Sequence, residues 1–475
     1  MILVRLGEIT VKSRRVRERF VRVLLRNIGD ALKSSGFRYK LRRERGRIFI
    51  YTDVAAVEPL RRVFGIKSLS IAEEVEFNGL RDLVEKAKEF FAEKVKGKRF
   101  AVRARRVGQH DFTSLDVERE LGAALLEYAK GVDLESPEVT AYVEVRGSRA
   151  YLYTEVVRGY GGLPIGVEGK VVALVSGGFD SAVAAWYVLR RGAEVHYLFC
   201  NLGGFTHEAG VLSVLRVLAE RWSYGYRPKL YVIDFKKILL EIRSKCRVEL
   251  LNVLLKRYML RAAERIAERI GAEAIVTGDS LGQVASQTLR NIYVSSLATK
   301  LPVLRPLIGF DKDDIVSMAR EIGTYEASAR VKEYCGAFAE RPRTWTDPEE
   351  VEVEEEKLGL GILEEALRRV KEVDLKELTA LPSIEDLEVD EPPPDSVVID
   401  LRSREKFSRW HIPGSISIPF LELPERVGEL DRSKTYVLVC DEGALSLEMA
   451  YILRSMGFKA FSLRGGVKRA RRKLS

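Results

Sequence analysis

The run KVVALVSGGFDS, residues 170–181, leads from an apolar strand through a glycine-rich turn into a helix. Its two glycines let the backbone turn tightly and come close to a phosphate, and N–H groups at the start of a helix attract an anion. The serine hydroxyls add donors, and Asp180 could cap the helix or hold Mg²⁺ against phosphate groups. We therefore predict a nucleotide-binding loop at 176–181, with an ordinary strand-to-helix turn as the alternative.

Strands and helices alternate after this loop. Short apolar runs predict strands at 171–175, 196–200, 230–235 and 274–277, and the segments between them predict helices at 180–191, 208–221 and 248–270. This alternation is typical of a doubly wound parallel sheet with helices on both faces, in which ligands bind beyond the carboxyl ends of the strands.

The N-terminal part of the chain is strongly basic. Residues 1–50 contain 15 Lys and Arg against 4 Asp and Glu, and residues 14–34 have the apolar spacing of an amphipathic helix. The segments around this helix predict two small α+β modules, with strands at 47–51, 99–107, 139–146 and 150–157 and helices at 55–64, 79–95 and 114–130. The charge indicates a polyanion-binding surface, and a solvated helix face is the alternative.

The C-terminal part begins with an acidic segment. Residues 351–395 hold 15 acidic and 5 basic residues and end near Pro392-Pro393-Pro394, which predicts a charged linker that is partly helical around 361–378. A last small block follows, with strands predicted at 397–401 and 435–439 and a helix at 446–457.

Length and composition favour a multidomain globular protein. The 475 residues suggest about three domains. No apolar run is long enough to span a bilayer and the N-terminus lacks a secretory signal, so we expect a cytoplasmic protein without a membrane segment. The four cysteines lie far apart, and the four histidines show no metal-ligand spacing, so no protein-bound metal is predicted beyond Mg²⁺ with a nucleotide.

Several strings together resemble a known family. SGGFDS is similar to the loop of ATP pyrophosphatases, which adenylate a carbonyl oxygen, and GEITVKSRRVRERF, FCNLGGFTHE, TGDSLGQVASQTL, RPLIGFDKDDI and EYCGAF are similar to strings of the tRNA 4-thiouridine synthetase (ThiI) family. The resemblance implies an enzyme that uses ATP and Mg²⁺ to adenylate a uridine, at position 8 of tRNA, and replaces its oxygen with sulfur. It implies the following domains: ferredoxin-like, 1–55; RNA-binding THUMP, 56–162; PP-loop, 163–345; acidic linker, 346–395; rhodanese-like, 396–475.

The resemblance also assigns site residues. Asp180 and Lys312 would be the charged residues needed for adenylation, and Lys312 suits a mobile point charge for a phosphate. The nucleotide site would comprise Leu174, Val175, Ser176, Gly177, Gly178, Ser181, Phe199, Cys200, Lys256, Gly278 and Gln287.

The last block resembles rhodanese domains. A strand ends at Cys440, and the loop DEGALS that follows would surround the thiol with N–H groups at a helix start, which favours a persulfide anion. Many rhodaneses carry Arg in this loop, where this chain has Asp441 and Leu445, and this departure disfavours small anionic sulfur donors. A persulfide delivered by a protein remains compatible with the loop, and a buried, inert Cys440 is the alternative.

The resemblance implies a relay between two cysteines. A persulfide on Cys440 would attack the adenylated carbon, and Cys335 would then form a disulfide with Cys440 and release the thiouridine. The persulfide donor would be a cysteine desulfurase or a similar protein, and a homodimer is left open. Cys246 is interpreted as structural. The alternative function is a sulfur carrier for thiamine thiazole biosynthesis, which needs Cys440 but not the RNA-binding modules.

Overall fold

The computed structural model describes residues 1–44, 46–331, 342–378, 385–420 and 422–474. The chain forms two compact units, Met1–Val167 with Arg190–Gly192 and Glu168–Leu189 with Ala193–Ser475. Helices and strands alternate through both, which confirms the predicted mixture of α+β and α/β modules. None of the helices in the described residues combines the length and apolar character needed to cross a membrane.

The first unit begins with an antiparallel sheet. Its strand order is β10-β4-β1-β3-β2. The elements are β1 (Ile2–Leu6), α1 (Arg14–Ser34), β2 (Lys40–Glu44), β3 (Arg47–Tyr51), α2 (Val57–Arg61), β4 (Ile66–Ile71) and β10 (Val157–Arg158). The predicted helix at 14–34 and strand at 47–51 are confirmed. The sheet continues past residue 55, the predicted end of this module, because the apolar strand β1 is paired on one side by β3 and on the other by β4.

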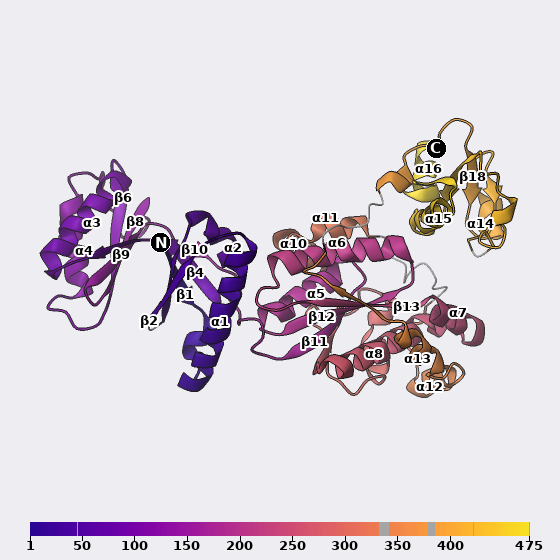
Figure 1. Ribbon diagram of the computed structural model, residues 1–475, viewed down its shortest axis with the longest axis horizontal. Helices are drawn as coiled ribbons and strands as arrows, with labels where there is room; N and C mark the ends of the chain where they lie inside the picture. The colour runs from indigo at the N-terminus through magenta and orange to yellow at the C-terminus, as the bar shows by residue number, and fades with distance from the viewer. Residues whose placement is uncertain (45, 332–341, 379–384, 421, 475) are drawn as a thin grey trace. The chain divides into compact units, whose positions relative to one another are not determined.

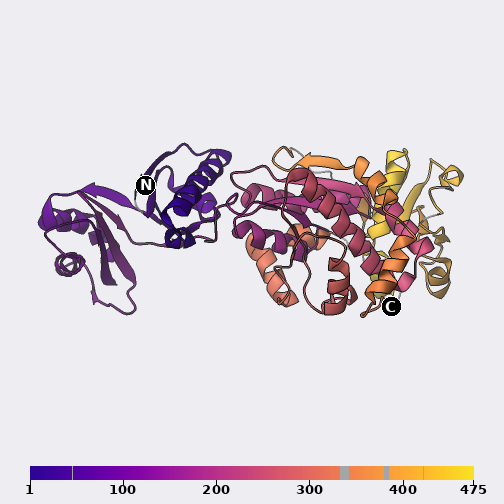
Figure 2. The same ribbon diagram turned by 90° about the horizontal axis from the view of Figure 1, so that it is seen from below.

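A second sheet completes this unit. Its strand order is β5-β9-β8-β6-β7. The elements are β5 (Glu73–Glu76), α3 (Gly79–Val95), β6 (Arg99–Val107), α4 (Ser114–Leu125), β7 (Gly131–Val132), β8 (Val139–Arg146) and β9 (Arg149–Tyr153). The two sheets occupy the indigo and violet parts of the chain in Figure 2. The strand predicted at 150–157 stops at Tyr153, because Val157 and Arg158 pair with β4 in the other sheet.

The second unit is built on a largely parallel sheet. Its strand order is β15-β14-β11-β12-β13-β16. The strands are β11 (Lys170–Leu174), β12 (Glu194–Asn201), β13 (Lys229–Asp234), β14 (Ala274–Val276), β15 (Val303–Leu304) and β16 (Lys371–Asp374). The helices are α5 (Phe179–Arg190), α6 (Phe205–Arg221), α7 (Lys236–Lys245), α8 (Leu251–Ile270), α9 (Leu289–Ser296), α10 (Lys312–Ile322) and α11 (Tyr325–Arg330). Figure 1 shows α6, α10 and α11 on one face of the sheet and α8 on the other.

The strand order places a switch point between β11 and β14, at the centre of this sheet. The chain runs from β11 outward to β12 and β13, then returns to place β14 on the opposite side of β11. The chain that leaves the carboxyl end of β11 therefore turns to one side of the sheet, and the chain that leaves the carboxyl end of β14 turns to the other. Open α/β sheets bind ligands at such a switch point.

Much of the acidic segment is folded against this sheet, so the prediction of a linker over 346–395 is wrong for this part. Residues 348–374 form α12 (Pro348–Glu356), α13 (Gly361–Arg368) and β16, which pairs antiparallel with β13. Glu355 accepts hydrogen bonds from the buried Arg257 at 2.7 and 3.1 Å. The acidic side chains thus neutralise arginines of α8, a pairing that charge counts along the sequence cannot reveal.

The chain ends in a separate parallel sheet of order β17-β21-β20-β18-β19. Its elements are β17 (Glu388–Val389), β18 (Val397–Asp400), α14 (Arg404–Arg409), β19 (Ile416–Ser417), β20 (Thr435–Val439), α15 (Ala444–Ser455), β21 (Lys459–Leu463) and α16 (Gly466–Leu474). The predicted strand at 435–439 is confirmed, and the predicted strand at 397–401 and helix at 446–457 are found within two residues of their bounds.

Candidate nucleotide, sulfur-transfer and RNA sites

The glycine-rich loop leaves β11 at the switch point and enters α5. Gly177 has a φ of +83°, and a Cβ there would come within 2.8 Å of the Val331 side chain. The Ser181 hydroxyl donates to the Gly178 carbonyl at 3.2 Å, which closes the turn. A left-handed residue packed this tightly requires glycine, so the sequence pattern is explained by the shape of the loop.

A second glycine brings the end of β14 against the loop. A Cβ on Gly278 would lie 2.7 Å from the backbone of Asp180 and Ser181. Any larger residue would push the two segments apart. The loops after β11 and β14, which are distant in sequence, therefore line one crevice.

Asp180 and Lys312 are in direct contact. The Lys312 Nζ atom lies 2.9 Å from both carboxylate oxygens of Asp180. Lys312 is the first residue of α10, where it remains exposed, and its Nζ atom lies 5.7 Å from the centre of the Phe179 ring. The structure thus brings together the two residues that the family resemblance assigns to adenylation.

Lys256 is held beside the crevice by a buried carboxylate. Asp279 accepts from Lys256 at 2.8 Å, from the Thr277 hydroxyl at 2.7 Å and from Arg305 at 3.2 Å. Burial alone would raise the pKa of Asp279, but its cationic partners lower it to about 2. Asp279 and Arg305 were not predicted as site residues, although they belong to the family-like strings TGDS and RPLIG.

A histidine of α6 touches the loop. The Nε2 atom of His207 donates to the Ser176 carbonyl at 3.0 Å, and its ring packs edge-on against Phe199 with centroids 4.7 Å apart. Burial lowers the pKa of His207 to about 4, against the opposite effect of the Ser176 hydrogen bond. The ring is therefore neutral near pH 7. Nothing in the spacing of the histidines along the chain indicates this position.

The other residues predicted for the nucleotide lie around the same edge. Leu174 ends β11, whereas Phe199 and Cys200 are buried at the end of β12. The Oε1 atom of Gln287 is buried and has no hydrogen-bond partner among the described residues. Cys335 lies outside the described residues.

The loop after β20 surrounds Cys440. The Gly443 N–H donates to the Cys440 Sγ atom at 3.1 Å, and the Ser446 hydroxyl lies 3.5 Å from it. Gly443 has a φ of +93° and immediately precedes α15, so the helix starts beside the sulfur. This environment stabilises negative charge on sulfur.

Cations offset the acidic residues of this loop. Asp441 pairs with Lys406 at 2.9 Å, and Glu442 pairs with Lys468. Arg402 lies 3.9 Å from Asp441 and is anchored by the fully buried Asp400. The two carboxylates that depart from the rhodanese pattern are therefore parts of ion pairs, an arrangement that the local sequence does not indicate.

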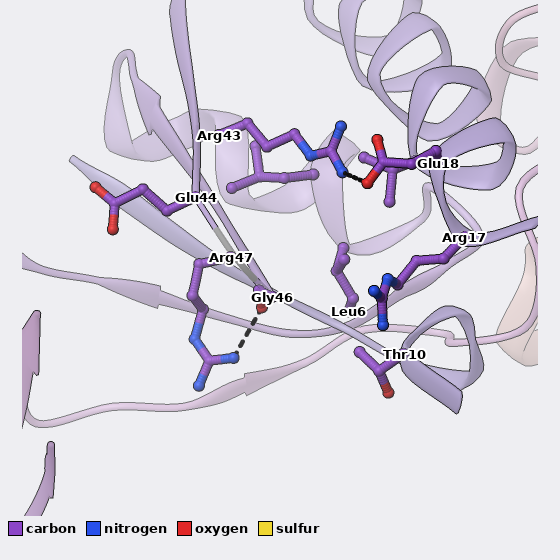
Figure 3. A pocket seen from close by; sticks show the side chains of 10 residues that line it. Leu6, Thr10, Arg17, Glu18, Arg43, Glu44, Gly46 and Arg47 are labelled. Atoms are coloured by element: carbon purple, nitrogen blue, oxygen red, sulfur yellow. Dashed lines mark hydrogen bonds and ion pairs between the residues drawn. The ribbon is translucent and has the colours of Figure 1, made fainter. Parts of the chain in front are cut away.

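The N-terminal unit carries a basic hollow, shown in Figure 3. Its volume is about 440 Å³, and its polar lining includes Arg17, Arg43 and Arg47. Arg43 is paired with Glu18 at 2.7 Å. Next to it, the first turns of α1 form a shallower hollow lined by Arg14, Arg15, Arg19 and Arg22, all of them exposed. Glu18 and Glu44 also line the first hollow, so the surplus of positive charge lies mainly on the first turns of α1, where four arginines surround Glu18. Exposed arginines clustered in this way are suited to a phosphate backbone.

A buried carboxylate, Glu144, and a half-buried one, Glu74, join the sheets of this unit. Glu144 accepts from Arg47 at 3.0 Å and from Arg146 at 2.7 Å, and Glu74 accepts from Arg42 at 2.8 Å. Burial would raise the pKa of Glu144, but the arginines lower it overall. The two sheets are thus tied by ion pairs and by an apolar cluster around Phe49 and Tyr151.

Comparison with known proteins covers the whole chain. A tRNA sulfurtransferase of Pyrobaculum aerophilum is 44% identical over 98% of this chain and 96% of its own, and one of Escherichia coli is 38% identical over 95% and 96%. The chain belongs to the tRNA sulfurtransferase family. The models of four modules match in turn: the ThiI ferredoxin-like domain, residues 1–70; THUMP domain, 78–155; thiamine biosynthesis protein (ThiI), 166–360; rhodanese-like domain, 384–473.

Solved structures agree with this family assignment. A 4-thiouridine synthetase in complex with RNA and bound ATP superposes with a TM-score of 0.71 at 35% identity, covering 78% of this chain and 98% of that one. PH1313 from Pyrococcus horikoshii gives a TM-score of 0.55 at 28% identity, covering 68% and 99%. Because the tRNA sulfurtransferase relatives span the RNA-binding modules as well, the sulfur-carrier alternative is not favoured.

Proposed function

We propose that this chain is an ATP-dependent tRNA sulfurtransferase that adenylates a uridine, at position 8, and converts it to 4-thiouridine. The observation that carries the proposal is the contact between Lys312 and Asp180 at the mouth of a glycine-rich loop placed at the switch point of a parallel sheet. The ATP and RNA bound to a solved 4-thiouridine synthetase support it.

ATP would bind with its triphosphate against the loop and the start of α5. Residues at the ends of β11 and β12, including Val175, Phe199 and Cys200, would hold the nucleoside, and Gly278 and Gln287 would close the site from the β14 side. The described residues contain no group of three His, Cys, Asp or Glu that could hold a metal ion. Mg²⁺ would enter with the triphosphate, where Asp180 offers a carboxylate, and would offset the charge of the phosphates.

The first step makes the base oxygen a leaving group. O4 of the uracil attacks the α-phosphorus, pyrophosphate departs, and the base is left as an adenylyl ester. Lys312 and Lys256 supply positive charge beside the phosphates, and Asp180 keeps the Lys312 ammonium at the mouth of the loop. Such fixed charges act where negative charge develops.

The second step brings sulfur to the activated carbon. The terminal sulfur of a Cys440 persulfide attacks C4, and AMP leaves with the former O4 oxygen. The Cys335 thiolate then attacks the sulfur atom of Cys440, so that the S–S bond to the substrate breaks and the second sulfur stays on C4 as a thiocarbonyl. The Cys335–Cys440 disulfide formed in this step must be reduced by an external thiol before the next turnover.

The arginine-lined hollows of the N-terminal unit would bind the RNA backbone. The ion pairs between the two sheets of this unit would hold the sheets in a fixed arrangement. A cysteine desulfurase is the donor that we propose for the Cys440 persulfide, because the loop has Asp441 and Leu445 where many rhodaneses carry Arg for small anionic donors. We propose the cytoplasm as the place of the reaction.

The test incubates purified protein with unmodified tRNA, Mg-ATP and a desulfurase with cysteine, and follows the near-ultraviolet absorbance of thiouridine. We expect ATP-dependent product that is lost in Cys440→Ala. Cys246→Ala is the matched control: its thiol hydrogen-bonds to the Glu354 carbonyl at 3.3 Å, and burial raises its pKa to about 11, so it should be inert. Normal product from Cys440→Ala with the protein donor would remove Cys440 from the relay.

A further inference from the structure

Helix α6 begins without a capping side chain of its own. Its N-cap is Gly204, with φ +79° and ψ −149°, and no side chain at that position can accept from the first N–H groups. Asn201 accepts from the N–H groups of Gly203 and Gly204 at 3.1 and 2.7 Å, which fixes the turn but not the helix start. When the first N–H groups of a helix are buried and have no capping side chain, they need a hydrogen-bond acceptor from elsewhere.

That partner comes from the terminal domain, which comprises the elements from β17 to α16. Glu448 of α15 accepts from the Phe205 N–H at 3.1 Å and from the Thr206 N–H and hydroxyl at 3.0 Å each. Only 4% of Glu448 is exposed, and Lys236 lies 3.9 Å away as a cationic neighbour. A carboxylate placed on two helix N–H groups satisfies the donors and meets the positive end of the helix dipole.

Packing around Glu448 makes this a defined contact. The rings of Phe205 and Tyr451 stack with centroids 4.0 Å apart and an interplanar angle of 9°. Ala444 and Leu445 pack into the apolar cluster of the nucleotide domain, the domain built on the sheet that contains β11–β14. A Cβ on Gly204 would overlap the Glu448 carboxylate, so the absence of a side chain there leaves room for it.

The position of the contact suggests its use. It lies at the end of β12, on the edge of the sheet where the nucleotide loop lies, and one residue beyond it His207 donates to the loop at Ser176. Ala444 begins α15 directly after the loop that carries Cys440. We propose that the start of α6 is the seat on which the terminal domain docks to deliver sulfur, with Glu448 as its positioning residue. The inference rests on the proposed function.

The seat is tested first by hydrogen exchange of the full chain. Glu448→Ala should raise amide exchange in residues 203–208, because the Phe205 and Thr206 N–H groups would have no acceptor. Tyr451→Ala should have the same effect, because the stacking on Phe205 is removed. Glu405→Gln, an exposed acidic residue of α14 paired with Arg409, removes the same charge from the same domain and should change nothing there. Unchanged exchange in Glu448→Ala would show that the seat is not occupied and would overturn the proposal.

Delivery is tested by single-turnover thiolation with each protein preloaded with persulfide on Cys440. We expect Glu448→Ala to be slower by at least about tenfold than the wild type and Glu405→Gln, since a misplaced reactant loses that much or more. With free sulfide, which needs no carrier, all three should react at the same rate. If Glu448→Ala is slow with both the persulfide and free sulfide, Glu448 only supports the fold. If it is slow with neither, the contact at α6 does not contribute to sulfur delivery. Each result contradicts the proposal. If the wild type makes no thiouridine from any donor, the proposed function fails and delivery fails with it, while the exchange data still report whether the domain is seated.

Discussion

Asp279 is a buried carboxylate with three side-chain partners beside the end of β14. It is 4% exposed and is bonded to Lys256, Thr277 and Arg305. Asp279→Asn keeps the volume but leaves two cations without their counter-charge. We expect the free energy of unfolding of the nucleotide domain to fall by about 3 kcal/mol, as for other broken buried pairs. We also expect a raised KM for ATP, because Lys256 loses its anchor.

Denaturant unfolding and initial-rate kinetics check this prediction, with Glu321→Gln as the control. Glu321 is exposed on α10, so its loss of one negative charge should leave both quantities unchanged. Full stability together with an unaltered KM in Asp279→Asn would show that the buried cluster neither supports the fold nor orients Lys256.

Lys312 is the residue that we propose to stabilise the charge that develops during adenylation. Lys312→Gln removes the charge beside Asp180 and should lower the rate of tRNA-dependent pyrophosphate release by about a hundredfold, the usual cost of losing one stabilising group. ATP binding, measured by titration without tRNA, should change far less. Equal losses in binding and rate would mean that Lys312 only holds the ground-state nucleotide.

At the scale of elements, the packing of α6 and β12 buries two histidines. Burial, aided by Lys170 and Lys229, lowers the pKa of His196 to about 4, and burial lowers that of His207 to about 4. The unfolded chain protonates histidine near pH 6.5. The folded protein therefore binds fewer protons between about pH 6.5 and pH 4, and its stability must fall as the pH falls through this window.

Chemical unfolding followed by the fluorescence of the buried Trp186 and Trp222 measures this effect. From near pH 7.5 to about pH 5 we expect each histidine to cost about 2 kcal/mol. The variant His196→Gln/His207→Gln should lose that part of the pH dependence. The control His411→Gln, which changes an exposed histidine of the terminal domain, should keep it. An equal pH slope in the double variant would contradict the burial account.

Most elements of the nucleotide domain could be predicted, because its parallel strands are continuous apolar runs. The helices α7 and α9 and the strand β15 were missed, and the helix predicted at 361–378 ends at Arg368 and is followed by the strand β16. The segment 371–374, Lys-Glu-Val-Asp, is mostly charged, and it becomes a strand because it pairs with the edge of β13. Tertiary pairing, not local pattern, decides such a strand.

The residues of the candidate site could be predicted where they belong to a sequence motif that follows the end of a strand. The sequence indicated Asp180 and Lys312 through family resemblance, and the structure places them 2.9 Å apart. Asp279 lies in the family-like string TGDS but was not assigned a role, and Glu448 lies in no motif. The ion pairs of Asp279 and the hydrogen bonds of Glu448 involve partners that are far away along the chain. The roles of Cys335, Cys440 and the nucleotide-binding residues stay predictions.

At the scale of the whole molecule, RNA binding should be electrostatic. Arg15 and Arg22 lie exposed on α1 beside the basic hollow. The variant Arg15→Ala/Arg22→Ala should weaken tRNA binding and lower the slope of log K against log salt by about one for each phosphate that is no longer neutralised. ATP binding should be unchanged.

Filter binding of labelled tRNA over a range of salt concentrations checks this prediction. Lys434→Ala, which removes an exposed positive charge of the terminal domain, is the control and should leave the slope as in the wild type. A weaker but equally salt-dependent complex in the arginine variant would show that these residues support the fold of α1 and do not bind phosphate.

ATP bound at 176–181 should turn a base oxygen of the RNA into a departing nucleotide. The direct measurement uses ATP labelled at the α-phosphate, with unmodified tRNA and every sulfur source withheld. We expect labelled AMP to become covalently attached to the tRNA and pyrophosphate to be released in equal amount. Asp180→Ala and Lys312→Gln should abolish or strongly reduce both. Release of inorganic phosphate from the γ-position, with no label ever found on the RNA, would contradict this expectation.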